Sequence, residues 1–581
     1  MNKKYIYTLL ASMLLISQIS FSQTDASQVE LDEVILSLPF SQDKGKSVIK
    51  VEKINLNDIN PILRSYISKS LSKLPGISII STGPGISKPS IRGLSSNRVI
   101  TYVQGVRLEN QQWGDEHGLG ISTSGINSLE LIKGPSYVTY GSDAMGGVLY
   151  IEPERYSSDF SLDYMGIYNS NYSGITNNLG LKGSSGNFSY LLRGNMTDNQ
   201  NFSNPDGEVE NTWFKENDIQ AGLKYQTENF SSDLRLSMNF SELGIPHMEE
   251  GHDDHDDHGH GESDAELDME LITNTLDMNL TMPQSDNFNL IIGSNNLSQE
   301  NKNFGHEELI PDAEMNDFGL YGLGQITMEN GAALIGIRYD SRSINSEMGS
   351  ADFSNFNGSV GIKRNFDNST LRINLGSGYR APSLIELFAD GVHHGTFRYE
   401  KGNSSLVAET SFQTDITLEI NNDDSSLSFD LFYNDINDYI YVSPSSLTMD
   451  SYKVYNYMQQ NATLWGGEIH YSKQTGIDWL TSHTSLEYIN GETADGHALP
   501  FIAPLTFNQV LTANISSNYS FEIDFLAKAK QSRVSQFEEE TDGYSLLNLS
   551  GNWMTSFLDN DLNIFWSVDN LFDKEYFDHL S

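Results

Sequence analysis

The sequence contains no cysteine, which excludes disulfide bonds and thiolate metal sites. Basic residues are scarce: 35 Lys and Arg against 78 Asp and Glu give a formal net charge of −43. This deficit argues against a nucleic-acid partner and favours cationic ligands, with a merely solubilising acidic surface as the alternative. Long hydrophobic runs are missing after the N-terminus and the mean hydropathy is −0.39, so we expect no membrane-spanning helix. Barrel strands stay possible, because they carry apolar residues only at alternate positions.

The first forty residues indicate an export signal followed by a flexible segment. Two lysines precede an apolar run over residues 5–19, which predicts a signal peptide over residues 1–22. Residues 23–40 include the acidic, β-branched stretch Leu31-Asp32-Glu33-Val34-Ile35 within a mostly polar segment. Such a stretch suits addition to the edge of a partner's sheet, and a disordered leader is the alternative.

Residues 41–153 form the next unit, in which short apolar runs are separated by glycine. Ile91-Arg92-Gly93 and Gly134-Pro135 are examples. Because glycine supplies the positive φ of tight turns, the pattern predicts a compact domain of small strands. The glycines between residues 141 and 147 are not followed by Gly-Lys-Ser/Thr, so we interpret them as turns and not as a phosphate loop.

From Phe160 onward, apolar and polar residues alternate with a period of two. Phe160, Leu162 and Tyr164 show the pattern, and residues 427–434 repeat it. Such segments often reach roughly ten residues and are rich in Tyr and Phe, as membrane-spanning strands require. We therefore predict a transmembrane β-barrel over residues 154–581, with about nineteen strands, in preference to a soluble sandwich.

The lengths of the connections predict which end of the barrel faces outward. In outer-membrane barrels the short turns face the periplasm and the long loops face outward. The histidine-rich connection is therefore expected to be extracellular. The short turns fall at residues 182–186, 227–229, 329–331 and 367–369, and the long connections at residues 197–210, 244–265 and 383–405.

The last predicted strand, residues 562–570, is followed by only a short tail. A barrel in lipid cannot leave an edge strand unpaired, because each bare N–H or C=O costs several kcal/mol there. We therefore expect a C-terminally truncated chain that lacks at least one closing strand. Direct pairing of residues near Ser581 with those near Phe160 would contradict this expectation.

Several motifs together resemble the TonB-dependent outer-membrane receptors. The resemblance implies a barrel of roughly 22 strands around an N-terminal α/β plug domain in the lumen. It also implies a TonB box at residues 31–37, through which TonB and its inner-membrane energising complex would drive import. The motifs are residues 31–37, Ile91-Arg92-Gly93, Gly134-Pro135 through Gly146-Gly147, Tyr379-Arg380-Ala381-Pro382-Ser383 with Glu386-Leu387-Phe388, Gly402-Asn403 with Glu409, and Asn570-Leu571-Phe572-Asp573.

The clearest chemical feature is a histidine- and aspartate-rich stretch. Four of the thirteen histidines fall between residues 252 and 260. Imidazoles with carboxylates suit Zn²⁺, with Ni²⁺ and Cu²⁺ as competitors. A solvated acidic loop is the alternative, and zinc-importing receptors of this family resemble the chain in having such a loop. The predicted ligands are His247, His252, Asp253, His255, Asp256, His258 and His260.

A second set of candidate ligands lies in the plug and in another outward loop. Asp115, Glu116 and His117 lie in a glycine-flanked stretch that we expect to face the outer opening, and a plain surface turn is the alternative. His393 and His394 lie in an expected outward loop, although adjacent histidines point apart.

Together these features predict TonB-dependent import of a divalent transition metal, zinc first, across the outer membrane of a Gram-negative bacterium. A receptor for copper, an iron siderophore or cobalamin is the alternative within the family. A passive porin or a surface adhesin is the alternative outside it. Neither Gly-x-Ser-x-Gly nor His-Glu-x-x-His occurs, so we expect no enzyme and no bound cofactor beyond the transported metal.

Overall fold

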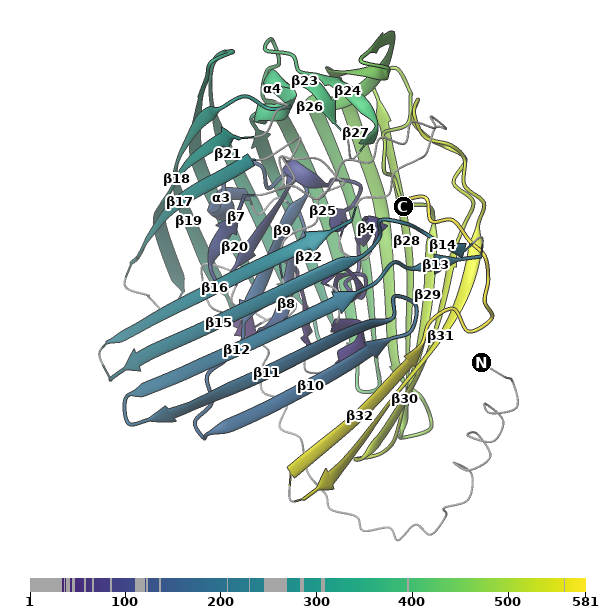
Figure 1. Cartoon of the computed structure of the whole chain (residues 1–581). Coiled ribbons are helices and arrows are strands. Elements are labelled where there is room, and N and C mark those ends of the chain that lie inside the picture. Colours follow the sequence, from purple (N-terminus) through teal and green to yellow (C-terminus); the bar gives the residue numbers. More distant parts are fainter. Residues whose placement is uncertain are drawn as a thin grey trace.

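The computed structural model describes a β-rich chain with few and short helices (Figure 1). None of the described helices has the length and apolar character that a membrane crossing requires. The described residues are 34–35, 37, 42–43, 47–56, 59–64, 67–83, 86–109, 121, 124–134, 137–205, 207–228, 230–244, 269–282, 287–304, 309–393, 396–558 and 560–580.

The N-terminal unit is a small mixed sheet with short helices, as the glycine-separated apolar runs predict. Its five strands follow the order β3-β8-β9-β6-β7, and only the β6–β9 pair is parallel. Leu129, Leu131 and Leu149 are fully buried at its centre. Its elements are β3 (Val51–Asn55), η3 (Pro61–Arg64), α2 (Ile67–Leu71), β4 (Ile77–Gly83), β5 (Ile86–Ile91), η4 (Ser96–Arg98), β6 (Val99–Val103), β7 (Val106–Leu108), β8 (Ile126–Ile132), α3 (Tyr137–Tyr140) and β9 (Gly147–Pro153).

The rest of the chain forms a wall of antiparallel strands that surrounds this plug (Figure 1). Among the described residues, one five-stranded sheet and fourteen strands along the path of a larger sheet make nineteen, as predicted. The first sheet contains β10 (Ser161–Asn169), β11 (Gly174–Ser185), β12 (Phe188–Asn199), β15 (Phe214–Gln226) and β16 (Ser231–Leu243). The second contains β17 (Met269–Thr281), β18 (Phe288–Asn303), β19 (Ala313–Met328), β20 (Gly331–Ser346), β21 (Gly349–Asn365), β22 (Ser369–Arg380), β25 (Glu409–Asn422), β26 (Ser425–Met449), β27 (Tyr452–Gln474), β28 (Leu480–Thr493), β29 (Thr506–Ser516), β30 (Tyr519–Lys528), β31 (Tyr544–Phe557) and β32 (Asn560–Val568).

Each wall strand has an apolar outer face and a polar inner face. On β20, Ile335 and Ile337 are 61% and 69% exposed, whereas Arg338 and Asp340 are both 4% exposed. Because successive side chains of a strand point to opposite faces, one set meets lipid and the other meets the plug. The predicted alternation is therefore confirmed, and it explains why the chain crosses the membrane despite its polar average composition.

The connections sort into two ends, with one difference from expectation. The predicted short turns follow β11, β15, β19 and β21, and the long connections follow β12, β16 and β22. At the long-loop end, however, β20 and β21 are joined by two residues, and so are β26 and β27. There the strands themselves lengthen, since β26 has 25 residues and β27 has 23. Strand extension thus replaces a loop on this side of the barrel.

The first and last wall strands each have one neighbour among the described residues. There β10 pairs with β11, and β32 pairs with β31. Strands β16 and β17 are likewise not paired with each other in the part of the chain that is described. After β32 the chain turns to the plug, where the Leu580 carbonyl accepts a hydrogen bond from the Ser81 N–H at 3.0 Å. The expected absence of a closing strand stays a prediction.

Candidate functional site

Most of the predicted ligands lie outside the described residues, and His393 is the exception. The ligands outside are His247, His252, Asp253, His255, Asp256, His258, His260, Asp115, Glu116, His117 and His394, and Leu31, Asp32 and Glu33 of the expected TonB box are also outside.

Strand β15, which pairs with the strand that leads into the histidine-rich connection, carries a buried acidic pair. Glu216 and Asp218 lie on the inner face near the outward end of β15, 9% and 3% exposed. Asn239 of β16 donates to both carboxylates, at 2.7 Å and 2.6 Å. Further down the same face, Gln220 donates to the carbonyl of plug residue Ser124 at 2.7 Å. Ser124, which follows the second ligand set in the sequence, therefore contacts the strand face that carries these acids.

His393 lies in an outward hairpin formed by β23 (Asp390–His393) and β24 (Arg398–Lys401). Its Nδ1 is 2.9 Å from Oε1 of Glu400, which also accepts from Arg398 at 2.7 Å. The other oxygen of Glu400 accepts from the Tyr457 hydroxyl at 2.6 Å. Strand β24 pairs in parallel with β27, so this cluster fastens the hairpin to the wall. The structure shows a hydrogen-bonded role for His393, and metal binding by it stays a prediction.

The surroundings of the Glu400 carboxylate favour its charged form. Burial by itself would raise its pKa, but the Arg398 guanidinium and the hydrogen bond from His393 outweigh burial. They hold the pKa of Glu400 well below its usual range.

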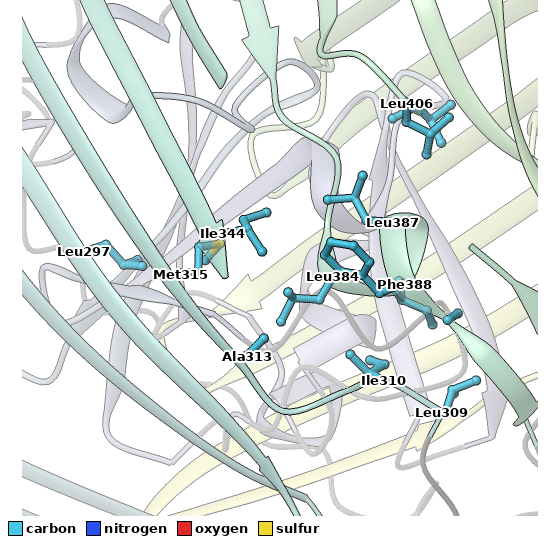
Figure 2. Close-up of a cluster of buried hydrophobic side chains, with 13 residues drawn as sticks. Leu297, Leu309, Ile310, Ala313, Met315, Ile344, Leu384, Leu387, Phe388 and Leu406 are labelled. Atoms are coloured by element: carbon cyan, nitrogen blue, oxygen red, sulfur yellow. The ribbon is translucent and has the colours of Figure 1, made fainter. Parts of the chain in front are cut away.

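The outward loops rest on an apolar cluster at the mouth of the barrel. Helix α4 (Leu384–Phe388) begins with a capping box, in which Ser383 and Glu386 satisfy each other's backbone N–H groups. Its side chains pack against Ile344 of β20 and Ile310 of the β18–β19 connection (Figure 2). The mouth is thus a packed platform, which holds the hairpin in one position.

Arg380 joins this platform to the plug. Its guanidinium donates to both oxygens of Glu386 and to both oxygens of Glu409, at 2.7 to 3.0 Å. Arg98 of the plug donates to the same Glu409 at 3.0 Å through Nε. Arg380 and Glu409 are fully buried. Three of the motif residues that support the family resemblance, Arg380, Glu386 and Glu409, therefore form one ionic network with Arg98.

A second network holds the outer side of the plug. Asp143 accepts from Arg107 of the plug at 2.7 Å and from Arg342 of β20 at 2.6 Å. Arg342 also donates to Asp317 of β19. Burial would raise the pKa of Asp143, but the two guanidinium groups outweigh burial and lower it.

A third network holds the inner side of the plug. Arg92 contacts Asp415 and donates to Glu468 at 2.9 Å, and Lys133 also donates to Glu468. The chain approaches the wall so closely here that glycine is required. At Gly134, with φ +85°, a Cβ atom would lie 2.8 Å from an Asp415 oxygen.

The described part of the expected TonB box is attached to the plug. Strand β1 (Val34–Ile35) pairs with β2 (Gln42–Asp43). Between them, the Ser37 N–H donates to the buried Glu130 carboxylate at 2.7 Å, and the Tyr140 hydroxyl donates to the Ser37 carbonyl.

The charges on the lumen side of the wall were not singled out from the sequence. Arg338 and Arg342 occupy inward positions of β20, between outward-facing apolar residues such as Ile337. A charged residue at every second or fourth position of a strand with an apolar opposite face is the signal that identifies such lumen contacts.

Two family descriptions match the chain. Residues 43–148 match the TonB-dependent receptor plug domain. Residues 133–571 match the TonB dependent receptor-like beta-barrel. Vitamin B12 transporter BtuB of Photobacterium profundum is 30% identical over 152 residues, which is 26% of this chain and 25% of that protein. The chain thus spans about a quarter of the length of this curated relative.

Solved structures share the fold over almost the whole chain. The Copper transporter OprC superposes with a TM-score of 0.76 at 18% identity and covers 94% of both chains. The FrpB iron transporter from Neisseria meningitidis (F5-1 variant, apoprotein form) superposes with a TM-score of 0.71 at 14% identity, over 92% of this chain and 96% of that one. The barrel description matches three-quarters of the sequence, and these solved structures have the same fold. The chain therefore belongs to the TonB-dependent receptors of the Gram-negative outer membrane.

Proposed function

We propose that this receptor imports a divalent transition metal ion, zinc first, across the outer membrane with energy supplied through TonB. The observation that carries the proposal is the stretch from His247 to His260, which contains five histidines and four aspartates. The stretch connects β16 to β17, at the end of the barrel where the long connections lie. Neutral imidazoles and carboxylates together match the ligand preference of Zn²⁺.

The histidine-rich connection would act as a collector. The net charge of −43 raises the local concentration of cations at the outer surface. Below the connection, Glu216 and Asp218 continue the acidic surface into the lumen. An ion released by the collector would therefore meet carboxylates next, and then the plug residues Asp115, Glu116 and His117 that we propose as a tighter site.

Coupling to TonB would use residues 31–37 as an added strand on TonB. The described contacts of Ser37 with Glu130 and Tyr140 hold this segment against the plug. A pull on the segment would thus act directly on β8 and α3, the elements that carry these two residues. We expect no catalytic activity, since the family consists of receptors and transporters.

The second candidate function is import of copper, an iron siderophore or cobalamin. The named relatives favour it, because they are a copper transporter, an iron transporter and a vitamin B12 transporter. In that case the histidine-rich connection would be ancillary. A passive porin or a surface adhesin is the remaining candidate.

The test is uptake of ⁶⁵Zn²⁺ by cells that depend on this receptor. We expect uptake that falls when residues 247–260 are replaced by a Gly/Ser segment and that stops when residues 30–38 are deleted. Excess Cu²⁺ and a ferric siderophore serve as competitors. Uptake that survives deletion of residues 30–38 would indicate a passive pore, and competition by Cu²⁺ or the siderophore alone would indicate the second candidate.

A further inference from the structure

Three side chains of types that can bind a metal ion lie close together on the inner face of the wall. Asp430 of β26 lies directly opposite Glu468 of β27, and His470 follows on the same face of β27. One ligand atom from each lies within 4.8 Å of the others. Asp430 and Glu468 are 1% and 2% exposed. Two carboxylates and an imidazole at this spacing form a ligand set that suits Zn²⁺.

His470 is oriented toward the carboxylates but is poorly satisfied. Its Nε2 is buried and has no hydrogen-bond partner of normal geometry among the described residues. The atom lies 3.5 Å from Oε2 of Glu468. A buried nitrogen without a good partner is costly, and a metal ion between the imidazole and the carboxylates would satisfy it.

In this structure, cationic side chains of the plug occupy the position at Asp430 and Glu468 where a metal ion would bind. The Lys50 ammonium donates to Asp430 at 2.7 Å and to Ser428 at 3.0 Å. Lys133 and Arg92 neutralise Glu468 in the same way.

An ion that passes between plug and wall on this side of the barrel would meet the cluster. If the plug moves, its cationic side chains leave the cluster, and the buried carboxylates remain without counter-charge. This costs several kcal/mol unless another cation takes the place of the plug's cationic groups. The affinity of these wall carboxylates for a metal ion is therefore highest when the plug has moved away from them.

A cavity begins at His470 of this cluster and extends along the wall toward the short-turn end of the barrel. It measures about 1060 Å³ and is lined by His470, His483 and Glu487 on the wall side. Glu487 lies opposite Glu468, and His483 lies opposite Ser472, two residues beyond His470. Two residues along a strand span about 6.7 Å, so the potential ligands follow one another at short intervals toward the inner opening.

We propose that Asp430, Glu468 and His470 form an exchange site for the imported divalent transition metal ion, which replaces the plug's cationic groups when the plug shifts. The inference rests on the proposed import of such an ion. It assigns the cavity beyond the cluster as the onward path.

The first experiment compares Zn²⁺ content of the purified full-length receptor and its variants after dialysis against buffered Zn²⁺. Lys50→Met removes one competing charge, and we expect it to retain one more Zn²⁺ per chain than the unaltered protein. Lys50→Arg keeps the charge and should gain none. Lys50→Met combined with His470→Ala should lose the added ion, while the histidine-rich connection contributes equally to every sample.

The second experiment gives a result even if the Lys50→Met variant does not assemble in the outer membrane. His470→Ala should lower ⁶⁵Zn²⁺ uptake roughly tenfold at unchanged surface binding, because one ligand of the exchange site is missing. Ser485→Ala, at the position opposite His470 on β28, is the matched control and should transport normally.

The results separate the two proposals. No added Zn²⁺ in Lys50→Met, or an added ion that survives His470→Ala, would overturn the exchange site and leave import intact. If Lys50→Met is not assembled, normal uptake by His470→Ala overturns the site. No uptake by the unaltered receptor would overturn metal import, and a His470-dependent Zn²⁺ gain would then still show that the wall binds the ion.

Discussion

At the scale of single residues, the main feature of the lumen is its buried charged side chains. Arg380 is fully buried between two carboxylates, and Arg92 and Arg342 are each shared between two acids. A buried ion is tolerated only when its hydrogen-bonding groups are satisfied by partners in a well-defined geometry. Such ion pairs determine how the plug fits against the wall more than they add to net stability. The loss of one partner leaves the charge of the other uncompensated.

Arg380→Met tests this account. The change leaves Glu386 and Glu409 buried without their shared cation, and we expect the free energy of unfolding to fall by about 3–5 kcal/mol. The measurement is denaturant unfolding of the detergent-solubilised receptor. Lys473→Met removes the cation of an exposed pair with Asp424, 4.0 Å apart, and should change stability by less than about 0.5 kcal/mol. Equal effects of the two substitutions would contradict the account.

At the scale of elements, one carboxylate links the outward hairpin β23–β24 to the wall. Glu400 collects hydrogen bonds from His393, Arg398 and Tyr457, and these join three strands. Its pKa is lowered in the folded hairpin. The carboxylate therefore stabilises the hairpin fully above the ordinary glutamate pKa of about 4.3, and this stabilisation is lost as the pH falls below that value.

Acidification should therefore open the hairpin before the wall unfolds. We expect hydrogen exchange at residues 390–401, corrected for intrinsic rates, to accelerate progressively below about pH 4.3. Glu400→Gln should exchange fast at every pH, because the amide cannot carry the charge. Glu347→Gln, in the exposed β20–β21 turn, should leave the profile unchanged. Protection of the hairpin that is independent of pH in the unaltered protein would refute the role of Glu400.

At the scale of the whole molecule, one sequence period separates lipid from lumen. Outward positions such as Ile335 and Ile337 form the apolar belt, and the inward positions between them contact the plug. One face of the barrel sheet therefore meets lipid and the other meets the lumen, and β26 and β27, with 25 and 23 residues, are long strands whose extension lies at the outward end.

Ile335→Arg should destabilise the assembled barrel by about 2–4 kcal/mol, since it places a charge in the middle of the belt. The measurement is the amount of heat-modifiable receptor in outer membranes and its unfolding midpoint. Leu447→Arg introduces the same side chain at an equally exposed position near the outer tip of β26, outside the belt, and should be tolerated. A tolerated Ile335→Arg would show that this face does not contact lipid.

The prediction from sequence succeeded where neighbours along the chain decide the structure. The alternation at Phe160, Leu162 and Tyr164 is enough to predict outward-facing strands, and these side chains are 63% to 67% exposed. Turn lengths were enough to sort most connections between the two ends. The two-residue turn after β26 was not expected, because the length of a strand beyond the membrane depends on its neighbours in the sheet.

The amino-acid sequence by itself determined the period of the strands, the glycine-rich plug and the acidic, histidine-rich connection, because these are properties of residues close together in the chain. Only the tertiary structure decided which charges meet. Arg92 and Glu468 are 376 residues apart, and nothing local marks them as partners. The reason is physical: a buried charge selects whichever opposite charge the surrounding wall brings within hydrogen-bonding distance, and that depends on the register of every strand between them.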